Sequence, residues 1–200
     1  MKRKFKLFAT VASLCLSVAL MAFGVYAATT VNYNVSSTVT FAAQVDVIWT
    51  ADVKDGEGTD LANGAANETA DFGPEIATGA PEATKAWAPV GNLSFGTGED
   101  TTDTIVYTFT CTNNGSQAVT IGVGTQQIFT EWATLIEQKD ISLTVSEKFG
   151  SDSASETGTL TGGSLDASEV YTVEITVVLK DKTVSVPNGN LTINFTAAAA

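Results

Sequence analysis

The feature that most constrains the fold is a long alternation of apolar and polar residues between Val31 and Trp49. A period of two residues places one set of side chains on a buried sheet face and the other toward solvent, which does not suit a helix. Apart from Ser37, the odd-numbered positions are apolar: Val31, Tyr33, Val35, Val39, Phe41, Ala43, Val45, Val47 and Trp49. A single strand of this length would run roughly 60 Å, far beyond the usual ~17–20 Å. We therefore expect two strands, or one bent strand that is shared between two sheets.

Strand patterns resume at Thr104 and continue on both sides of a turn signal at Asn113–Ser116. The run before the turn and the run after it each place apolar residues at alternate positions: Ile105, Tyr107, Phe109 and Cys111, then Val119, Ile121 and Val123. An Asn-Gly pair between two alternating runs is the strongest short-range signal for a β-hairpin. The sequence therefore predicts that these two runs pair with each other.

The remaining segments complete an all-β pattern. Apolar residues at helical spacing predict one short helix near Gln126–Gln138. Strands are expected at Ile141–Phe149, Val170–Lys180 and Leu191–Ala197, with a second Asn-Gly turn at Asn188-Gly189. Seven or more short strands without a βαβ rhythm indicate an antiparallel β-sandwich or a jelly-roll-like fold in a single domain.

Residues 52–103 differ from the rest of the chain. They hold eleven of the 22 acidic residues, eight of the glycines and three of the four prolines. This composition predicts an irregular, solvated acidic insertion with one short strand around Val90–Phe95. Loops of this length inside a compact domain are unusual and are typically either functional or disordered.

The N-terminus has the three parts of a secretory signal peptide. Its first six residues, MKRKFK, carry four positive charges, an apolar run from Leu7 to Ala28 follows, and small residues stand at Ala27 and Ala28. This order predicts export with cleavage after Ala27, so that residues 1–27 are removed and residues 28–200 form a secreted domain. Contact with the membrane is then expected only before cleavage. The alternative is a retained membrane anchor, because the run is long enough to span a bilayer.

Charge and composition exclude several classes of function. The net charge is −12, and removal of residues 1–27, which carry four of the ten basic residues and none of the acids, makes it −16. A chain of this charge does not neutralise phosphates, so we expect no nucleic-acid partner. The chain has no His, which removes Ser-His and Cys-His catalysis, and Cys111 falls on an apolar strand face. We expect no enzyme; a carboxylate-dependent hydrolase is the least favoured alternative.

One acidic cluster is a candidate calcium site. Four carboxylates surround two glycines in the segment DVKDGEGTD: Asp52, Asp55, Glu57 and Asp60. Calcium prefers hard oxygen ligands on flexible loops. The spacing does not match an EF-hand, because Lys54 and Asn63 stand where that loop has ligands. An ordinary solvated acidic turn is the favoured interpretation, and no other cofactor is expected.

Three tryptophans raise the alternative of a module that binds a glycan or a host surface. Trp49 and Trp132 fall on apolar periodicities and are expected in the core. Trp87, next to a Pro-containing segment, is the one that we expect to be exposed. A single exposed tryptophan is a limited stacking platform for a sugar.

The end of the signal peptide carries a resemblance to a known family. Gly24, Tyr26 and Ala27 form a Gly-x-Tyr-Ala exit that leads directly into Thr- and Val-rich strands with Asn-Gly turns. In these features the chain resembles the TasA/camelysin-type exported biofilm matrix proteins of Gram-positive bacteria. The resemblance implies a secreted jelly-roll protein that assembles into extracellular fibres.

The residues themselves offer a mechanism for such assembly. Cleavage would free an amphipathic β segment, Thr29–Phe41, at the start of the mature chain. A free strand can pair with an open sheet edge of a neighbouring subunit, and head-to-tail contacts of this kind produce filaments. The alternative is that the segment is the first strand of its own sandwich. We therefore expect an extracellular or cell-surface structural protein whose partner is a second copy or another extracellular protein.

Overall fold

The computed structural model describes residues 35–43, 45–61, 83–87, 103–181, 184 and 186–200, and for residues 83–87 it describes the backbone alone. The contacts divide the chain into two units, residues 1–31 and 32–200, and everything described lies in the second. The signal peptide 1–27 and the strand expected at Val90–Phe95 fall outside the described residues.

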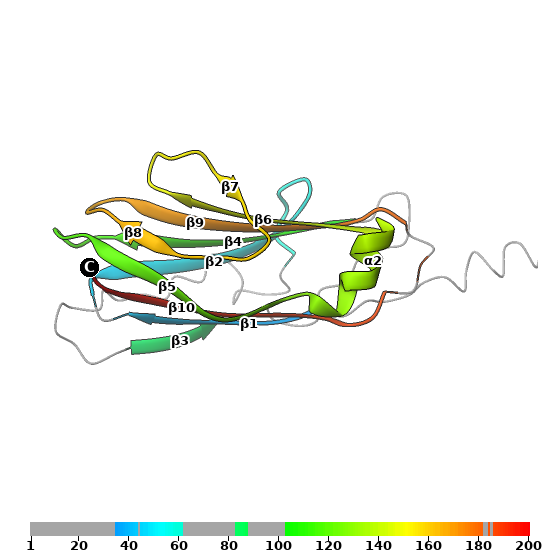
Figure 1. Cartoon of the computed structure of the whole chain (residues 1–200), viewed down its shortest axis with the longest axis horizontal. Coiled ribbons are helices and arrows are strands. Elements are labelled where there is room, and N and C mark those ends of the chain that lie inside the picture. Colours follow the sequence, from blue (N-terminus) through cyan, green and yellow to red (C-terminus); the bar gives the residue numbers. More distant parts are fainter. Residues whose placement is uncertain (1–34, 44, 62–82, 88–102, 182–183, 185) are drawn as a thin grey trace, which may run out of the picture. The chain divides into compact units, whose positions relative to one another are not determined.

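The described residues form two five-stranded sheets packed face to face, with one short helical segment (Figure 1). The first sheet has the order β3 (Ala83–Trp87), β1 (Val35–Ala43), β10 (Gly189–Ala199), β5 (Val119–Ile128) and β8 (Gly163–Leu165). The second has the order β2 (Val47–Asp55), β4 (Thr104–Asn113), β9 (Val170–Leu179), β6 (Ile141–Phe149) and β7 (Ser155–Glu156). This arrangement confirms the all-β sandwich.

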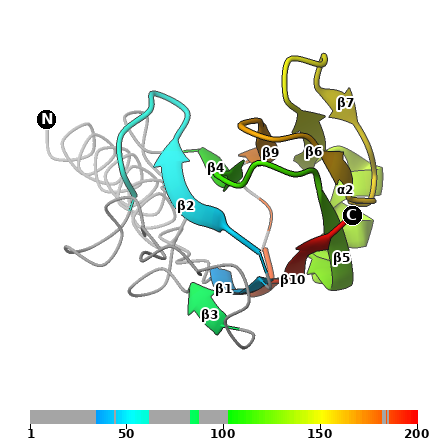
Figure 2. The ribbon, with the colours of Figure 1, turned by 90° about the vertical axis from the view of Figure 1, so that its left-hand side faces the viewer.

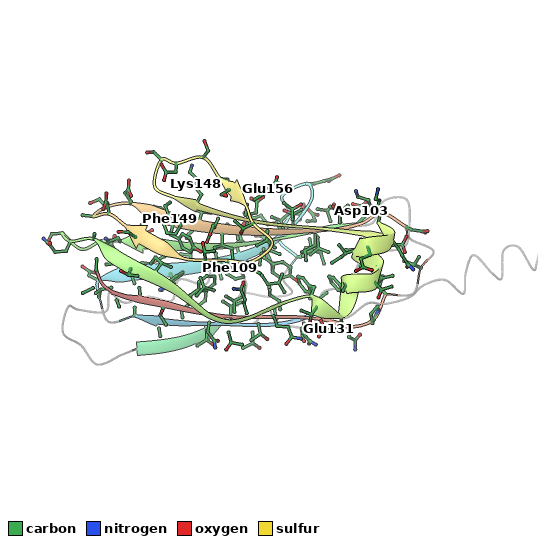
Figure 3. The ribbon with its side chains drawn as sticks, viewed as in Figure 1. Asp103, Phe109, Glu131, Lys148, Phe149 and Glu156 are labelled. Carbon is green, nitrogen blue, oxygen red and sulfur yellow. The ribbon has the colours of Figure 1, made fainter. Side chains whose placement is uncertain are left out.

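The alternation at the start of the chain forms two strands, one in each sheet. β1 and β2 both bury their odd-numbered side chains, as far as Val53 in β2, and a corner that includes Val45 and Asp46 carries the chain from the first sheet to the second. The two strands then face the same core, where the Phe41 ring lies 4.8 Å from Trp49 and 6.2 Å from Phe109. Phe195 of β10 stacks on Phe41 at 5.6 Å. Figure 2, an end view, shows the two layers, and Figure 3 places Phe109 between them.

The sandwich is antiparallel except for one pair of strands. β1 and β10 run parallel, in continuous register from Val35 opposite Gly189 to Ala43 opposite Ala197. The sandwich expected from the sequence thus includes, among the described strands, one parallel pair. A parallel pair needs a long crossover connection, and here the connection is nearly the whole domain, because β1 is the first described strand and β10 the last.

The predicted hairpin at Asn113–Ser116 does not form. β4 belongs to the second sheet and β5 to the first, so the intervening segment arches between the sheets. Both strands direct their apolar side chains into the same core, and they do so from opposite sheets. Asn113 is buried in the arch, where its Nδ2 donates to the carbonyl oxygens of Gln117 at 2.9 Å and Asp166 at 3.0 Å.

The second predicted Asn-Gly turn, at Asn188-Gly189, is also wrong, because Asn188 is not in a turn and Gly189 is already in a strand. Gly189 begins β10 rather than closing a turn. A Cβ atom at this position would lie 2.2 Å from Cζ2 of Trp132, so the glycine allows the indole to pack against the backbone.

The helical segment is shorter than predicted. Residues 126–128 complete β5, a 3₁₀ turn follows at Thr130–Trp132, and α2 covers Ala133–Gln138. Trp132 is buried, stacks on Phe129 at a centroid distance of 4.4 Å, and donates from Nε1 to the Pro187 carbonyl oxygen at 2.9 Å.

The predicted insertion begins later than its composition indicates, because residues 52–55 belong to β2. Strand β3, at residues 83–87, lies inside it and was not predicted. The strand at Ile141–Phe149 is confirmed at both ends; β9 ends at Leu179, and β10 extends the predicted Leu191–Ala197 in both directions.

Candidate functional site: the first strand and its slot

Strand β1 occupies a slot between two other strands of the first sheet. Its whole length pairs with β10, and its second half, from Val39 to Ala43, also pairs with β3 in antiparallel register. The alternative interpretation from the sequence is thus confirmed for these residues: Val35–Ala43 is the first strand of its own sandwich. Residues 29–34 of the predicted free segment lie outside the described residues.

The inner side of β1 supplies part of the aromatic core. Val35, Val39, Phe41 and Ala43 are all buried. If β1 left the slot, the rings that contact Phe41 would face water, and β10 would offer an unpaired backbone edge. Exposed apolar surface next to an open strand edge is a template for pairing with another chain.

Two serines of β1 show different polar environments. The Ser37 hydroxyl points inward, its residue is 6% exposed, and its Oγ has no hydrogen-bond partner in the structure. On the outer side, the Ser36 hydroxyl donates to Oδ1 of Asn190 at 2.5 Å. The same Asn190 donates from Nδ2 to Oε1 of Glu131 at 2.7 Å. Glu131 lies in the 3₁₀ turn near the start of β10, and Figure 3 labels it.

The segment at residues 150–169, which we call the excursion, is held in a different way. It leaves β6, contributes β7 to one sheet and β8 to the other, and returns to β9. The buried Glu147 carboxylate accepts hydrogen bonds from the Thr161 amide and hydroxyl, from the Gly162 amide at 3.3 Å and from the Tyr171 hydroxyl at 3.1 Å. Burial raises the pKa of the Tyr171 hydroxyl, and the negative charge of Glu147 raises it further.

A second polar contact fixes the far part of the excursion. The Gln126 side chain donates from Nε2 to the Leu160 carbonyl oxygen at 2.9 Å and accepts from the Leu160 amide at 2.9 Å. The nitrogen and oxygen of the Gln126 side-chain amide bond both the carbonyl and the N–H of Leu160. This pair of hydrogen bonds sets the position of the excursion against β5.

The four calcium candidates lie at the end of β2 and in the turn after it. Lys54 Nζ lies 2.8 Å from Oδ2 of Asp52 and 3.9 Å from Oδ1 of Asp60. The hydrogen bond and the charge of Asp52 raise the pKa of Lys54. Oδ1 of Asp55 accepts from the amides of Glu57 at 2.9 Å and Thr59 at 2.7 Å, which closes the turn. Among the described residues, no three His, Cys, Asp or Glu side chains gather as metal ligands would, so the calcium site stays a prediction.

The other sequence candidates are placed as follows. Trp49 and Trp132 are in the core, and Cys111 is buried and free, with burial raising the pKa of its thiol. The side chain of Trp87 lies outside the described residues, so the glycan-binding alternative is not tested. None of the described helices is long and apolar enough to span a membrane.

Sequence reasoning missed the three polar residues that matter here: Ser37, Asn113 and Glu147. The signal was present in the period-two pattern. Each stands at one of the alternate positions whose side chains point inward in its strand. Glu147, for example, is two residues from Val145 and two from Phe149. A polar residue at an inward position requires a partner or carries a cost in stability.

Comparison with known proteins yields little. No protein-family model matches the chain, and no curated protein sequence does. Among solved structures, the chain is similar to a mutant of the major pilin from Streptococcus pyogenes, with a TM-score of 0.26 and 10% sequence identity. The match covers 82% of this chain and 48% of the pilin, so the chain spans about half the length of that protein.

Proposed function

We propose that the chain is an exported structural protein of the cell surface or extracellular matrix whose copies join by exchange of strand β1. The observation that carries the proposal is the position of β1, the first described strand, in a slot between two strands of its own sheet and next to a short corner. β1 is held mainly by backbone pairing and apolar contacts. A β1 strand from another copy provides the same contacts.

The corner at Val45 and Asp46 is the hinge of this exchange. The Val47 amide donates to the Val45 carbonyl oxygen at 2.9 Å, and the Asp46 carbonyl oxygen accepts from the Asn114 amide at 3.0 Å. The Asn114 contact belongs to the body of the sandwich and stays there when β1 moves. Short hinges between an end strand and the rest of a domain favour swapping between copies.

Exchange in one direction produces a filament. Each copy gives its β1 to the next and receives one from the previous, which is a head-to-tail contact that does not close. This is strand addition to a sheet, in which backbone hydrogen bonds supply affinity and side-chain pockets supply specificity. The lack of histidine and the predicted export agree with a structural role, and no catalytic function is proposed.

A disulfide between β1 and its own β10 tests the proposal. Thr38 and Thr192 are register partners on the outer side, so Thr38→Cys/Thr192→Cys can fasten β1 in its own chain. The matched control, Thr50→Cys/Thr110→Cys, fastens β2 to β4 at register partners of the same residue type. The oxidised first variant is expected to stay monomeric and to form filaments after reduction, whereas the control forms filaments in both states, as seen by electron microscopy.

A mixture of two single variants gives the complementary result. Filaments grown from equal amounts of Thr38→Cys and Thr192→Cys chains are expected to contain disulfides between different chains, visible as a covalent dimer after denaturation. Filament growth by the oxidised double variant would contradict strand exchange, and so would filaments of the mixture without covalent dimers. Protease treatment of intact cells, followed by detection of the chain, tests the surface location separately.

A further inference from the structure

In a strongly acidic protein, the three central strands of the first sheet carry no charged residue, whereas the edge strand β3 contains Lys85 and the Glu131 carboxylate bonds Asn190 on the outer side. Strands β1, β5 and β10 contain no Asp, Glu, Lys or Arg at all. Apart from Ala42 and Ala198, the outward residues of β1 and β10 have hydroxyl or amide side chains, and we call these residues the neutral face: Ser36, Thr38, Thr40, Asn190, Thr192, Asn194 and Thr196. Figure 3 shows the side chains on this side of the sheet directed away from the other layer.

The outer side of the second sheet provides the comparison. It is also rich in threonine, but it carries charges on three strands: Asp52 and Lys54 on β2, Glu174 on β9 and Lys148 on β6. The preference of threonine for strands explains the hydroxyl groups on both sheets. It does not explain why three neighbouring strands of one sheet lack charge, or why asparagine, which is disfavoured in strands, stands on the neutral face.

Two glycines of β5, Gly122 and Gly124, place no side chain on the surface beside the neutral face. A Cβ at Gly122 would lie 2.5 Å from Oγ1 of Thr196, so the threonine leans over the space that a side chain would fill. Gly124 lies beside Asn194, where a Cβ would be 3.5 Å from the Asn194 Cβ. Glycine inside a strand often marks a bulge or a place where another chain approaches closely. The bulge between Ile193 and Phe195 is at the same position.

We infer that the neutral face is a lateral interface between two copies of this chain. Two copies of the mature chain, each with the net charge of −16 expected after removal of residues 1–27, repel one another. Away from Glu131, which bonds Asn190 near the start of β10, the neutral face lets them approach without bringing carboxylates together. Hydroxyl and amide groups both donate and accept hydrogen bonds, so the same face can meet itself across a two-fold axis. A sugar is the less suitable occupant, since no outward residue of β1, β5 or β10 is aromatic.

This interface is independent of strand exchange, since the neutral face is complete while β1 remains in its own slot. Thr196, which is exposed near the end of β10, is the residue to charge. Thr196→Glu and Thr196→Lys place like charges opposite each other in an association of two identical chains. Thr144→Glu and Thr144→Lys, at an exposed position on β6, are the matched controls for net charge.

Sedimentation velocity of the mature chain over a concentration series is the measurement. We expect the wild type to associate and either Thr196 variant to associate at least tenfold more weakly. An equal mixture of Thr196→Glu and Thr196→Lys chains is expected to regain association, because opposite charges then meet. Both Thr144 variants should behave as the wild type. Monomers at every concentration, an equal loss in the Thr144 variants, or no recovery in the mixture would overturn the inference.

A polysaccharide is the other occupant to be examined with the same variants. Retention of the wild type on an insoluble cell-wall polysaccharide, lost in both Thr196 variants while the wild type itself stays monomeric, would assign the neutral face to a glycan and overturn the inference. Equal retention of the wild type and the Thr196 variants supports the lateral interface.

Discussion

Strand β1 and the excursion at residues 150–169 both complete the sandwich, but different kinds of contact hold them. The excursion is tied by part-buried side-chain hydrogen bonds, from Thr161 and Gly162 to Glu147 and between Leu160 and Gln126. β1 is held by a backbone ladder and apolar packing, and its one buried hydroxyl, Ser37, has no partner. Buried polar contacts demand one geometry, whereas a ladder and an apolar slot accept an equivalent strand from another molecule. The difference separates a segment that is fixed from one that is suited to exchange.

The largest expected effect is the loss of stability caused by a change in β1. Phe41→Ala removes a ring that contacts Trp49, Phe109 and Phe195, and we expect it to lower the free energy of unfolding by about 3–5 kcal/mol. Hydrogen exchange should lose protection first in β1 and β10. Phe149→Ala is the control, because Phe149 is half-buried against Tyr171 next to the excursion. If both variants lose protection in the same segments, the two sides are not independent.

The next effect is on the excursion. Glu147→Gln keeps the shape of the side chain but weakens the acceptor shared by Thr161, Gly162 and Tyr171, and we expect a loss of about 1–3 kcal/mol in unfolding free energy. Exchange should become faster at the Thr161 and Gly162 amides, while filament formation is unchanged. Glu156→Gln, an exposed change in β7, should have no effect. If Glu147→Gln lost filaments while Glu156→Gln kept them, the excursion would take part in assembly, and the distinction between it and β1 would be wrong.

A smaller change of opposite sign is expected at Ser37. Ser37→Ala removes a buried hydroxyl that has no partner, so we expect stability to rise by about 1 kcal/mol and filament growth to slow. Ser36→Ala, one residue away, removes the outward hydrogen bond to Asn190 instead and should slightly lower stability. Chemical denaturation and a light-scattering time course measure the two quantities. Faster growth of Ser37→Ala would contradict the exchange of β1.

The smallest expected effect is that of calcium on the melting temperature. The candidate ligands lie at the end of β2 and in the turn after it. Asp52 and Asp60 already face the Lys54 ammonium, and Asp55 accepts two backbone amides. We therefore expect the same melting temperature in calcium as in chelator. Lys54→Met frees the two carboxylates and is the variant to compare. A calcium-dependent rise in the wild type would establish the site predicted from the sequence, and a rise in Lys54→Met alone would show that the lysine takes the place of the ion.

The sequence predicted the faces of the strands better than their partners. Alternation alone identified the buried side chains of β1, β2, β4 and β9, because a period of two depends only on the local backbone. The Asn113–Ser116 segment was wrongly predicted to close a hairpin, because an Asn-Gly pair usually marks a sharp reversal within one sheet. In the structure, the two flanking strands face one core from opposite sheets. The parallel pairing of β1 with β10 joins residues more than 150 positions apart, which no local pattern encodes.

The slot around β1 and the hydrogen bonds that hold the excursion could not be predicted either, because they too join segments that are far apart in the sequence. Glu147 could be placed on an inward face from its parity, but its partners Thr161 and Tyr171 come from two separate segments. Ser37 could be recognised as an inward polar residue, but only the packed structure shows that its hydroxyl has no partner.

The parallel ladder between β1 and β10 also has a mechanical consequence. β1 begins beside Gly189, the first residue of β10, and both strands run toward the end of the sandwich where the C-terminus lies (Figure 1). Tension applied between the start of β1 and the end of β10 therefore acts along both strands and in opposite directions. The hydrogen bonds from Val35 to Ala43 would be loaded in shear and would have to break together. An antiparallel pair pulled from adjacent ends would instead unzip one bond at a time, so this topology resists stretching along the strands.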